Sequence, residues 1–410
     1  MQLGRLGAGF VATFHAMALQ QVRGVELTAV LKRRGAEALA HVARQQHLGP
    51  ARLSDRIADI AHAVDVLAIY APHDARVAIM EEIVAAVSGG AELRGVICEK
   101  PLGRNVAEAR RLVNLALDAR LPTAYFENQL HMKPVHKQRA QLAPVQRTLG
   151  PLLLVRTAEE QSGPHAGWFW DPVRQGGGTL SDMGCHSSAL GWYLLTPVGK
   201  DVTLLQPQAV SAEIALLKWG QPRWRAHLRA TYGVDYDKTP AEDCATGLIT
   251  YRHPDTGQRV KAQFTTSWMY DKQGLRLWLE GLGPGYTFEA NSLASPLSVC
   301  VSDAAAAAPA DQEAALEKAT ASRGLLPVQH NEADLDGYTD ENTDAMAAFA
   351  AGKDARLSWH YGLEITRLVM AAYMAAERRQ TIELTDPASQ HELATFVPAV
   401  QRGLGRDVLS

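Results

Sequence analysis

Short apolar runs alternate with helical patterns along the first third of the chain. The apolar runs lie at residues 3–6, 25–31, 64–70, 95–98 and 123–126, and the amphipathic stretches between them lie at 10–21, 36–47, 74–87 and 106–119. Strands and helices that alternate in this way form a parallel sheet covered by helices. The pattern predicts an α/β domain over residues 1–127.

The pattern changes after about residue 150. Alternating, β-branched and aromatic-rich runs occupy residues 152–160, 210–218, 245–252, 260–270 and 275–280, with helical patterns at 180–195, 342–351 and 361–378. Because these runs follow one another closely, they predict a large, mostly antiparallel sheet. We expect a second α/β domain over residues 128–410, with the option that its final residues pack back on the first. The alanine run 304–308 and its polar surroundings indicate a surface excursion or an insertion.

Composition narrows the class of protein. The 410 residues are 47% hydrophobic and 21% charged, which suits two domains, and the net charge of −3 favours neither nucleic acid nor membrane as a partner. The four cysteines, Cys98, Cys185, Cys244 and Cys300, are scattered, which predicts neither a metal site nor disulfides. Since no apolar run approaches the ~20 residues that span a bilayer, we expect a cytoplasmic protein that acts on a small molecule.

A glycine-rich turn joins the first expected strand to the first expected helix. Gly7 permits a tight turn, Gly9 leaves room for a pyrophosphate near the backbone, and Phe10 and Val11 open the helix whose N-terminus attracts anions. The turn predicts a dinucleotide site at these four residues. Alternatively, it is a packing turn between strand and helix.

Three cations follow the second expected strand. An NAD site commonly presents a carboxylate there to the adenosine ribose, whereas this chain has Lys32, Arg33 and Arg34. A guanidinium can hold the oxygens of a 2′-phosphate, so NADP is preferred over NAD. The alternative is a solvated charge run before a helix.

Ala71, Pro72 and His73 follow the run 64–70 and begin the next helix. A turn at this place borders the nicotinamide half of a dinucleotide, although a plain strand-to-helix connection explains the same residues. We include the three residues among the candidate cofactor contacts.

Lys100 follows the run 95–98 and precedes Pro101, which ends the strand. Its side chain therefore projects from the carboxyl edge of the sheet, where open α/β sheets bind ligands. The ammonium group there stabilises an alkoxide that develops as a hydroxyl is oxidised. An exposed lysine at a loop start is the alternative.

Asp182 and His186 are spaced i, i+4 in the expected helix 180–195, so they share one face. A histidine takes or returns the hydroxyl proton, and the carboxylate orients the substrate or the ring. The alternative is an exposed Asp–His pair. The preceding Gly176, Gly177 and Gly178 favour the functional interpretation, because such backbone freedom suggests the close approach of a ligand.

These motifs together resemble the Gfo/Idh/MocA family, which includes glucose-fructose oxidoreductase and inositol dehydrogenase. The resemblance implies an N-terminal Rossmann dinucleotide-binding domain and a C-terminal substrate-binding and oligomerisation domain whose open sheet pairs subunits into a homodimer or homotetramer. It also implies that Lys100 is catalytic, Asp182 binds substrate or is catalytic, and His186 is the acid/base. Glu99 is implied to be structural or adjacent to the cofactor. The Ala71-Pro72-His73 turn departs from the family's usual Thr-Pro-Asn type.

Aromatic residues and polar groups gather just before the triple glycine. His165, Trp168 and Trp170 suit the edge of a pyranose pocket, and Asn128 follows the last strand of the first domain within reach of it. A hydrophobic plug and a linker role are the respective alternatives.

The sequence therefore predicts an NAD(P)-dependent oxidoreductase that moves hydride between nicotinamide and a secondary hydroxyl or ketone of a pyranose, glycoside or cyclitol. The alternatives on the same fold are an oxidative glycosidase that retains NAD, a reductase of a non-sugar carbonyl or imine, and a dinucleotide-binding sensor without turnover.

Overall fold

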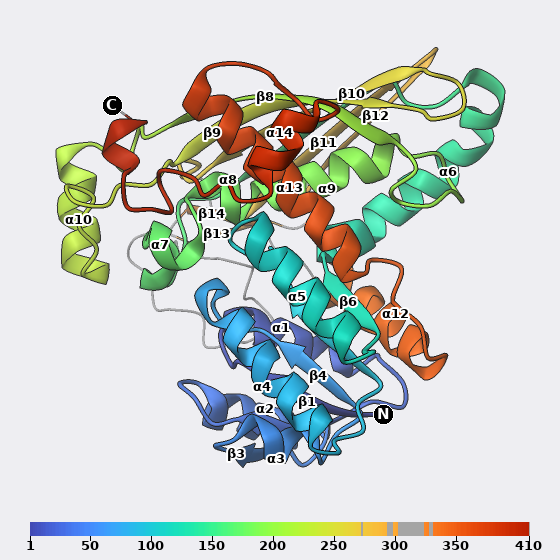
Figure 1. Ribbon diagram of the computed structural model, residues 1–410, viewed down its shortest axis with the longest axis vertical. Coiled ribbons are helices and arrows are strands. Elements are labelled where there is room, and N and C mark those ends of the chain that lie inside the picture. The colour runs from blue at the N-terminus through green and yellow to red at the C-terminus, as the bar shows by residue number, and fades with distance from the viewer. Residues whose placement is uncertain (272–273, 293–297, 302–323, 328–330, 410) are drawn as a thin grey trace. The chain divides into compact units, whose positions relative to one another are not determined.

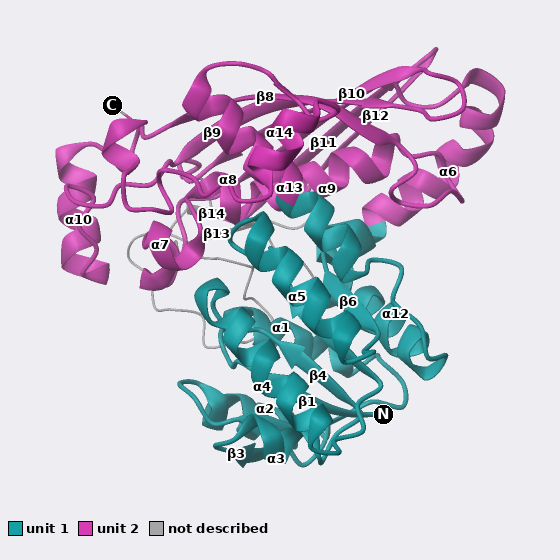
Figure 2. Ribbon diagram, viewed as in Figure 1, with its two compact units in different colours: residues 1–133, 333–366 teal, residues 134–332, 367–410 magenta. Residues whose placement is uncertain are grey.

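The computed structural model describes residues 1–271, 274–292, 298–301, 324–327 and 331–409 (Figure 1). These form two compact units, which Figure 2 shows in different colours. Unit 1 contains residues 1–133 and 333–366, and unit 2 contains residues 134–332 and 367–410. No described helix is both long and apolar enough to cross a membrane. The predicted insertion around the alanine run 304–308 lies outside the described residues.

Unit 1 is built on a six-stranded parallel sheet. Its strands are β1 (Gln2–Leu6), β2 (Glu26–Leu31), β3 (Arg52–Ser54), β4 (Val66–Ile69), β5 (Gly95–Glu99) and β6 (Thr123–Phe126). Their order, β3-β2-β1-β4-β5-β6, places the topological switch between β1 and β4, where such sheets bind ligands. The predicted N-terminal α/β fold is confirmed.

The helices of unit 1 include those predicted at residues 10–21, 36–47, 74–87 and 106–119. The described helices of this unit are α1 (Phe10–Leu19), α2 (Ala36–Gln45), α3 (Ile57–Ala61), η1 (His73–Ala75), α4 (Arg76–Ser88), α5 (Val106–Asp118), η2 (Asn128–His131) and α12 (Tyr338–Ala350). A cap begins α5, because the Asn105 side chain accepts the Glu108 backbone N–H at 3.0 Å. Strand β3 and helix α3 were not predicted, since each is too short to show a clear period.

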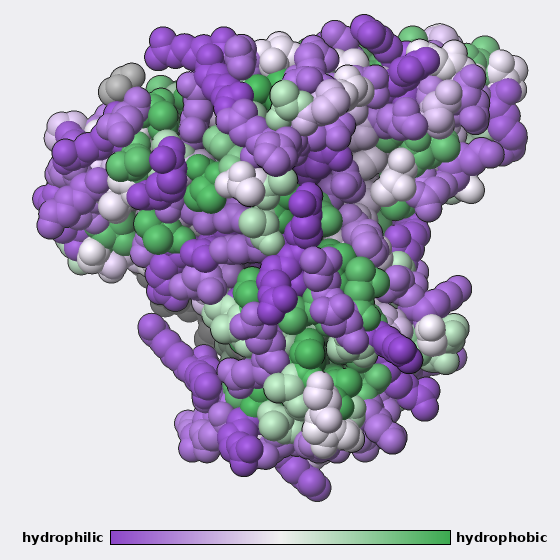
Figure 3. All heavy atoms as spheres, viewed as in Figure 1, coloured by the Kyte–Doolittle hydropathy of each residue, from purple (hydrophilic) through white to green (hydrophobic). Residues whose placement is uncertain are grey.

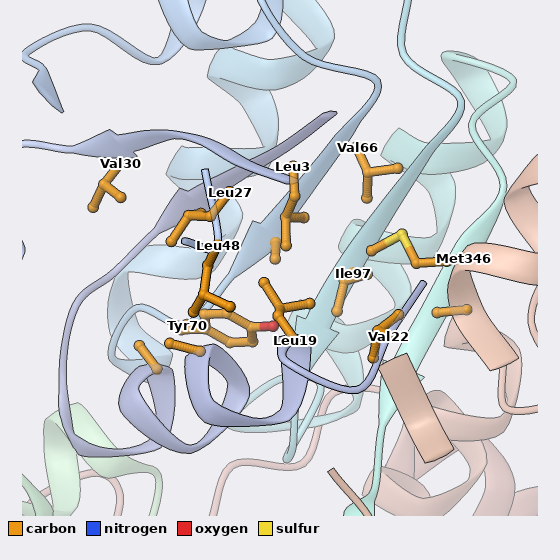
Figure 4. Packing of buried hydrophobic residues seen from close by; sticks show 14 of the residues in the cluster. Leu3, Leu19, Val22, Leu27, Val30, Leu48, Val66, Tyr70, Ile97 and Met346 are labelled. Carbon is orange, nitrogen blue, oxygen red and sulfur yellow. The ribbon is translucent and has the colours of Figure 1, made fainter. Parts of the chain in front are cut away.

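A late segment of the chain completes the core of unit 1. Met346 of α12 belongs to the same buried cluster as Leu3 and Ile97 (Figure 4). A Cβ added to Gly95 would come within 2.6 Å of the Phe349 ring, so the ring lies directly on β5. The indole N–H of Trp359 donates to the Ala124 carbonyl at 3.1 Å. The segment 333–366 is therefore part of this core.

Unit 2 contains a seven-stranded sheet with the order β12-β11-β7-β10-β9-β8-β15. Its strands are β7 (Leu154–Glu160), β8 (Gln206–Ala215), β9 (Cys244–Arg252), β10 (Arg259–Ser267), β11 (Arg276–Gly283), β12 (Tyr286–Asn291) and β15 (Ile382–Glu383). Only the pairing of β7 with β10 is parallel among the described pairs of this sheet, which confirms the mostly antiparallel prediction. A separate hairpin pairs β13 (Ser298–Val301) with β14 (Gly324–Pro327).

Helices α8 (Thr179–Asp182) and α9 (Gly184–Leu195) pack on one face of this sheet, against β7, β9 and β10. The other helices of unit 2 are η3 (Gly167–Trp170), α7 (Pro172–Gln175), α10 (Pro222–Tyr232), α14 (Pro387–Leu393) and η6 (Gly405–Asp407), while α6 (Lys133–Leu149), α11 (Glu332–Leu335) and α13 (Trp359–Arg378) each span a boundary between the units. A Cβ added to Gly191 would come within 2.7 Å of the Ala262 Cβ, so α9 packs closely on β10.

The other face of the sheet is polar. Lys261 and Gln263 of β10 are exposed between buried neighbours. Arg156 forms an ion pair with Glu280 across the β7–β11 pairing on the same face. Hydrophilic side chains also cover most of the surface visible in Figure 3, with apolar groups showing between them.

The predicted helix 180–195 is divided in two, which corrects that prediction. Met183 separates α8 from α9 because its φ of −115° departs from helical geometry. Helical hydrogen bonds nevertheless run across it, from Met183 N to Thr179 O at 2.8 Å and from Ser187 N to Met183 O at 3.1 Å. The two short helices are therefore continuous in their backbone hydrogen bonding.

Candidate functional site

The glycine turn after β1 has the geometry that the sequence predicts. Gly7 has a φ of +130°, and a Cβ there would come within 2.6 Å of the Tyr70 backbone, so no larger residue fits. A Cβ at Gly9 would meet nothing within 4 Å, and among the described residues no side chain caps α1. The glycine turn thus leaves open space beside the N-terminus of α1, where a helix attracts anions.

Lys32, Arg33 and Arg34 follow β2 and are all exposed. Their loop ends at Gly35, where an added Cβ would come within 2.6 Å of the Ala8 carbonyl oxygen. The cations therefore lie on a loop that touches the glycine turn.

A buried arginine holds the turn that carries Lys100. The Arg76 guanidinium donates to the carbonyl of Glu99 at 2.5 Å, to that of Lys100 at 3.3 Å, and to that of Pro101. Its Nε also donates to the Ala71 carbonyl at 3.2 Å. Because the Arg76 guanidinium binds carbonyls of both turns, it fixes the position of the turn that carries the half-buried Lys100 relative to the turn at Ala71. The Lys100–Pro101 peptide is cis.

Sequence reasoning did not find Arg76. The arginine stands at the start of α4 without a motif around it, and its burial is visible only in the folded chain. An arginine three residues after the Ala71-Pro72-His73 turn is the one signal that the sequence offers.

The Glu99 carboxylate faces inward. One oxygen accepts the Lys100 backbone N–H at 3.0 Å, and the other lies 2.7 Å from His15 Nε2. Asn342 Nδ2, which can only donate, lies 2.9 Å from His15 Nδ1 and so places the imidazole proton on Nε2. Burial lowers the pKa of His15, which favours this neutral form. These contacts support the structural interpretation of Glu99.

Further charges complete this buried cluster. Glu341 Oε1 lies 3.8 Å from His15 Nε2, and burial, with the neighbouring Glu99 and Glu127, raises the pKa of Glu341 well above its usual range. Arg5 is also fully buried and donates to a carbonyl of α1 at 2.6 Å. The cluster thus brings the titratable groups of His15, Glu99 and Glu341 together in the core of unit 1.

Asp182 and His186 lie in unit 2 on α8 and α9, and both are buried, with 1% and 4% of their surfaces exposed. Gln161 Nε2 lies 3.4 Å from Asp182 Oδ2. The alternative of an exposed surface pair therefore does not hold. Because burial of polar groups is costly, the two buried titratable side chains stay candidates for the functional site.

The triple glycine is explained by the protein itself. Gly177 has a φ of +153°, and a Cβ there would come within 2.0 Å of the Tyr373 hydroxyl. A Cβ at Gly178 would come within 2.1 Å of the Glu242 carbonyl oxygen. The expectation that a ligand requires these glycines is corrected for Gly177 and Gly178, because Tyr373 and Glu242 of the same unit occupy the space.

Trp170 belongs to the core of unit 2. It is 1% exposed, and its ring lies 4.5 Å from that of Trp219 and 5.0 Å from that of Trp268. Its indole N–H donates to the Pro164 carbonyl at 3.0 Å. This geometry favours the hydrophobic plug over the pocket edge for Trp170.

Trp168 and His165 are half-buried and stay candidates for the pocket edge. Both rings lie beside Phe169, with centroid distances of 3.9 Å for Trp168 and 6.0 Å for His165. Asn128, in contrast, lies in unit 1, where its amide donates to the Asp336 carbonyl at 2.8 Å. That contact favours the linker role for Asn128.

The cofactor candidates converge within unit 1. Parallel strands end at one edge of their sheet, so the residues after β1, β2, β4 and β5 lie along that edge. They are Gly7, Gly9, Phe10, Val11, Lys32, Arg33, Arg34, Ala71, Pro72, His73, Glu99 and Lys100. Unit 2 carries the other candidates, Asp182, His186, His165 and Trp168.

An uncapped helix behind a glycine turn, at the switch point of a parallel sheet, defines the class of dinucleotide-binding proteins. Residues 1–123 match the model of an oxidoreductase family with an NAD-binding Rossmann fold. Residues 138–282 match the model of the GFO/IDH/MocA C-terminal domain, and the two matches together cover more than half of the chain. The chain belongs to the Gfo/Idh/MocA family of oxidoreductases, and its N-terminal fold is NAD-binding.

Solved structures share this fold at low identity. GenD2 from gentamicin A biosynthesis, solved with NAD, is 22% identical, with a TM-score of 0.71 over 94% of this chain and 97% of its own. A putative myo-inositol dehydrogenase from Sinorhizobium meliloti 1021 is 19% identical, with a TM-score of 0.67 over 94% and 100%. A levoglucosan dehydrogenase, solved with NADH, is 17% identical, with a TM-score of 0.65 over 94% and 99%. None of the curated proteins compared with the chain matches it.

Proposed function

We propose that the protein moves hydride between nicotinamide and a secondary hydroxyl or ketone of a pyranose, glycoside or cyclitol. The observation that carries the proposal is the burial of Asp182 and His186 in the helices of a Gfo/Idh/MocA oxidoreductase. Structures of similar fold include a putative myo-inositol dehydrogenase and a levoglucosan dehydrogenase. Their names support the polyol class without specifying a substrate.

Unit 1 is proposed to be the dinucleotide-binding domain, with NADP preferred over NAD. The open space at Gly9 and the uncapped N-terminus of α1 fit a pyrophosphate. The exposed Arg33 and Arg34, on a loop that touches this turn, fit a 2′-phosphate. When bound, the nicotinamide supplies the site that accepts or returns the hydride.

The residues of the chain are proposed to handle the proton and the developing charge. In the oxidation direction, His186 takes the proton of the substrate hydroxyl, and Lys100 stabilises the resulting oxygen. Asp182 fixes the orientation of the substrate or of the imidazole. Trp168 and His165 are proposed to border the sugar, because an aromatic face suits the C–H face of a pyranose.

We also propose a homodimer or homotetramer that forms through the polar outer face of the unit 2 sheet. A cytoplasmic location is also proposed, on the scattered spacing of the four cysteines in the sequence. Size-exclusion chromatography with light scattering tests the oligomer, and a monomer at micromolar concentration refutes it.

Turnover tests the function. Native mass spectrometry of the purified protein is followed by absorbance-monitored reduction of NAD and NADP with a panel of pyranosides and inositols. Polyol-dependent reduction is expected. Aglycone release without net cofactor reduction would instead indicate the oxidative glycosidase, and binding without any turnover would indicate the sensor.

Two variants test the assigned roles. Lys100→Met is expected to abolish turnover and to spare dinucleotide affinity, whereas Lys353→Met, at an exposed lysine of the same unit, serves as the control. Equal loss of turnover and affinity in Lys100→Met would contradict its role.

The joint change of Arg33 and Arg34 to Ala is expected to weaken NADP more than NAD. A change of the exposed Arg23 and Arg110 to Ala removes the same charge from unit 1 as a control. Equal weakening of both cofactors would remove the 2′-phosphate argument.

A further inference from the structure

Glu242, which is distant in sequence, caps the N-terminus of α8, the helix that carries Asp182. Glu242 Oε1 accepts the backbone N–H of Gly178 at 2.9 Å and that of Leu180 at 3.0 Å. The backbone carbonyl of Glu242 accepts the N–H of Thr179 at 3.1 Å. One residue thus serves three of the four N–H groups that a helix start leaves without a partner in its own helix.

Tyr373 of α13 serves the fourth. Its hydroxyl accepts the N–H of Ser181 at 3.1 Å and shares that of Gly178 at 3.3 Å. The same hydroxyl donates its proton to Glu242 Oε1 at 2.6 Å. The hydroxyl is therefore fixed in direction, as an acceptor toward the helix and a donor toward the carboxylate.

The arrangement leaves little freedom to this helix start. Glu242 and Tyr373 are both fully buried. The close contacts of Gly177 with the Tyr373 hydroxyl and of Gly178 with the Glu242 carbonyl leave no space for a Cβ at either glycine. The absence of a side chain at Gly177 and Gly178 thus leaves the space that Tyr373 and Glu242 occupy.

Asp182 is one helical turn from this cap. Its backbone N–H makes the first hydrogen bond of the helix, to the Gly178 carbonyl at 3.1 Å. A rotation or shift of the capped turn therefore moves the Asp182 carboxylate, and the continuing hydrogen bonds across Met183 transmit the movement to His186.

We propose that Glu242 and Tyr373 are positioning residues that set the place of Asp182, and through it His186, for the reaction. The role in the reaction rests on the proposed function, whereas the cap itself does not. Neither residue is proposed to touch substrate or cofactor.

Three variants separate the contribution of the Tyr373 hydroxyl from that of the Glu242 side chain. Tyr373→Phe removes the hydroxyl and retains the ring, and Glu242→Ala removes the side-chain acceptor. Glu242→Gln retains a carbonyl oxygen for the same N–H groups and is the conservative rescue. Tyr251→Phe is the matched control, because Tyr251 is buried in the same unit and its hydroxyl has no hydrogen-bond partner among the described residues.

Amide hydrogen exchange tests the cap without reference to activity. Exchange at Gly178 and Ser181 is expected to be roughly 5- to 30-fold faster in Tyr373→Phe than in the unmodified chain, since the N–H groups of both residues lose the Tyr373 hydroxyl as an acceptor. Tyr251→Phe is expected to leave these amides unchanged. Equal exchange in both tyrosine variants would overturn the proposal.

Steady-state kinetics test the positioning. Tyr373→Phe and Glu242→Ala are expected to lower kcat/KM for the polyol by roughly 10- to 100-fold with an unchanged KM for the dinucleotide, since small displacements at a reacting group are costly. Glu242→Gln is expected to stay closer to the unmodified enzyme. A purely structural role would lower kcat in proportion to the folded fraction and leave the polyol KM unchanged, and that result would overturn the proposal.

The two hypotheses fail in different ways. If no polyol is turned over by the unmodified protein, the proposed function fails, and the exchange measurement still tests the cap. If polyols are turned over and Tyr373→Phe behaves like Tyr251→Phe, the function stands and the positioning role is wrong.

Discussion

The buried carboxyl group of Glu242 makes the stability of unit 2 depend on pH. Burial raises the pKa of Glu242 from 4.5 to about 7, although the Tyr373 hydroxyl and the N–H groups of Leu180 and Gly178 lower it. The folded state therefore favours the neutral acid. The stabilising contribution is fully present below pH 4.5 and is lost as the pH rises through about 7.

The size of the effect follows from the shift. A difference of about 2.5 pKa units corresponds to roughly 3.4 kcal/mol at 1.36 kcal/mol per unit. Glu242→Gln keeps a carbonyl acceptor for the capped helix and does not ionise. The free energy of unfolding of the unmodified protein, relative to this variant, is thus expected to fall by roughly 3 kcal/mol between pH 4.5 and pH 8.5.

Denaturant-dependent hydrogen exchange of peptides from α9 reports on unit 2 by itself, which avoids treating two units as one transition. Tyr373, Tyr236 and Asp243 surround Glu242 in both proteins, so their titration cancels in the difference to first order. A difference that stays within about 0.5 kcal/mol over this pH range would refute the raised pKa.

Three further results are expected in unit 1. Arg76→Lys replaces the planar fork with a point charge, so turnover should fall roughly 10- to 100-fold, and steady-state kinetics showing unchanged kcat would contradict the clamp. Asn105→Ala removes the cap of α5 and should lower the free energy of unfolding in urea by about 1 kcal/mol. Asn105→Asp keeps an acceptor and is the control. Phe349→Ala should cost roughly 3–5 kcal/mol by the same measurement, and a cost below about 1 kcal/mol would show that the ring does not fill the core.

The sequence predicts the parts of the fold that repeat a regular period. The parallel sheet follows from alternating apolar and amphipathic segments, and the glycine turn follows from Gly7 and Gly9, whose geometry the structure bears out. The mostly antiparallel sheet follows from runs close together in sequence. These features depend on local pattern, which is what a sequence displays.

Other features depend on contacts between distant segments. Hydrogen bonds to backbone groups determine the roles of Arg76, Glu242 and Tyr373. Every residue offers such backbone groups, so no sequence motif marks either partner of these bonds. The triple glycine was visible, but only the fold shows that Glu242 and Tyr373 fill the space. Trp170 likewise suited a pocket and a core equally well until its neighbours were known.

The completion of unit 1 by residues 333–366 bears on how the chain folds during synthesis. The strands of the first unit leave the ribosome early, yet Met346, Phe349 and Trp359 follow only after most of the chain has been made. Until then β5 and β6 lack the side chains that cover them. The nascent first unit therefore exposes apolar surface to water or to a chaperone until residues 333–366 are made and pack on it.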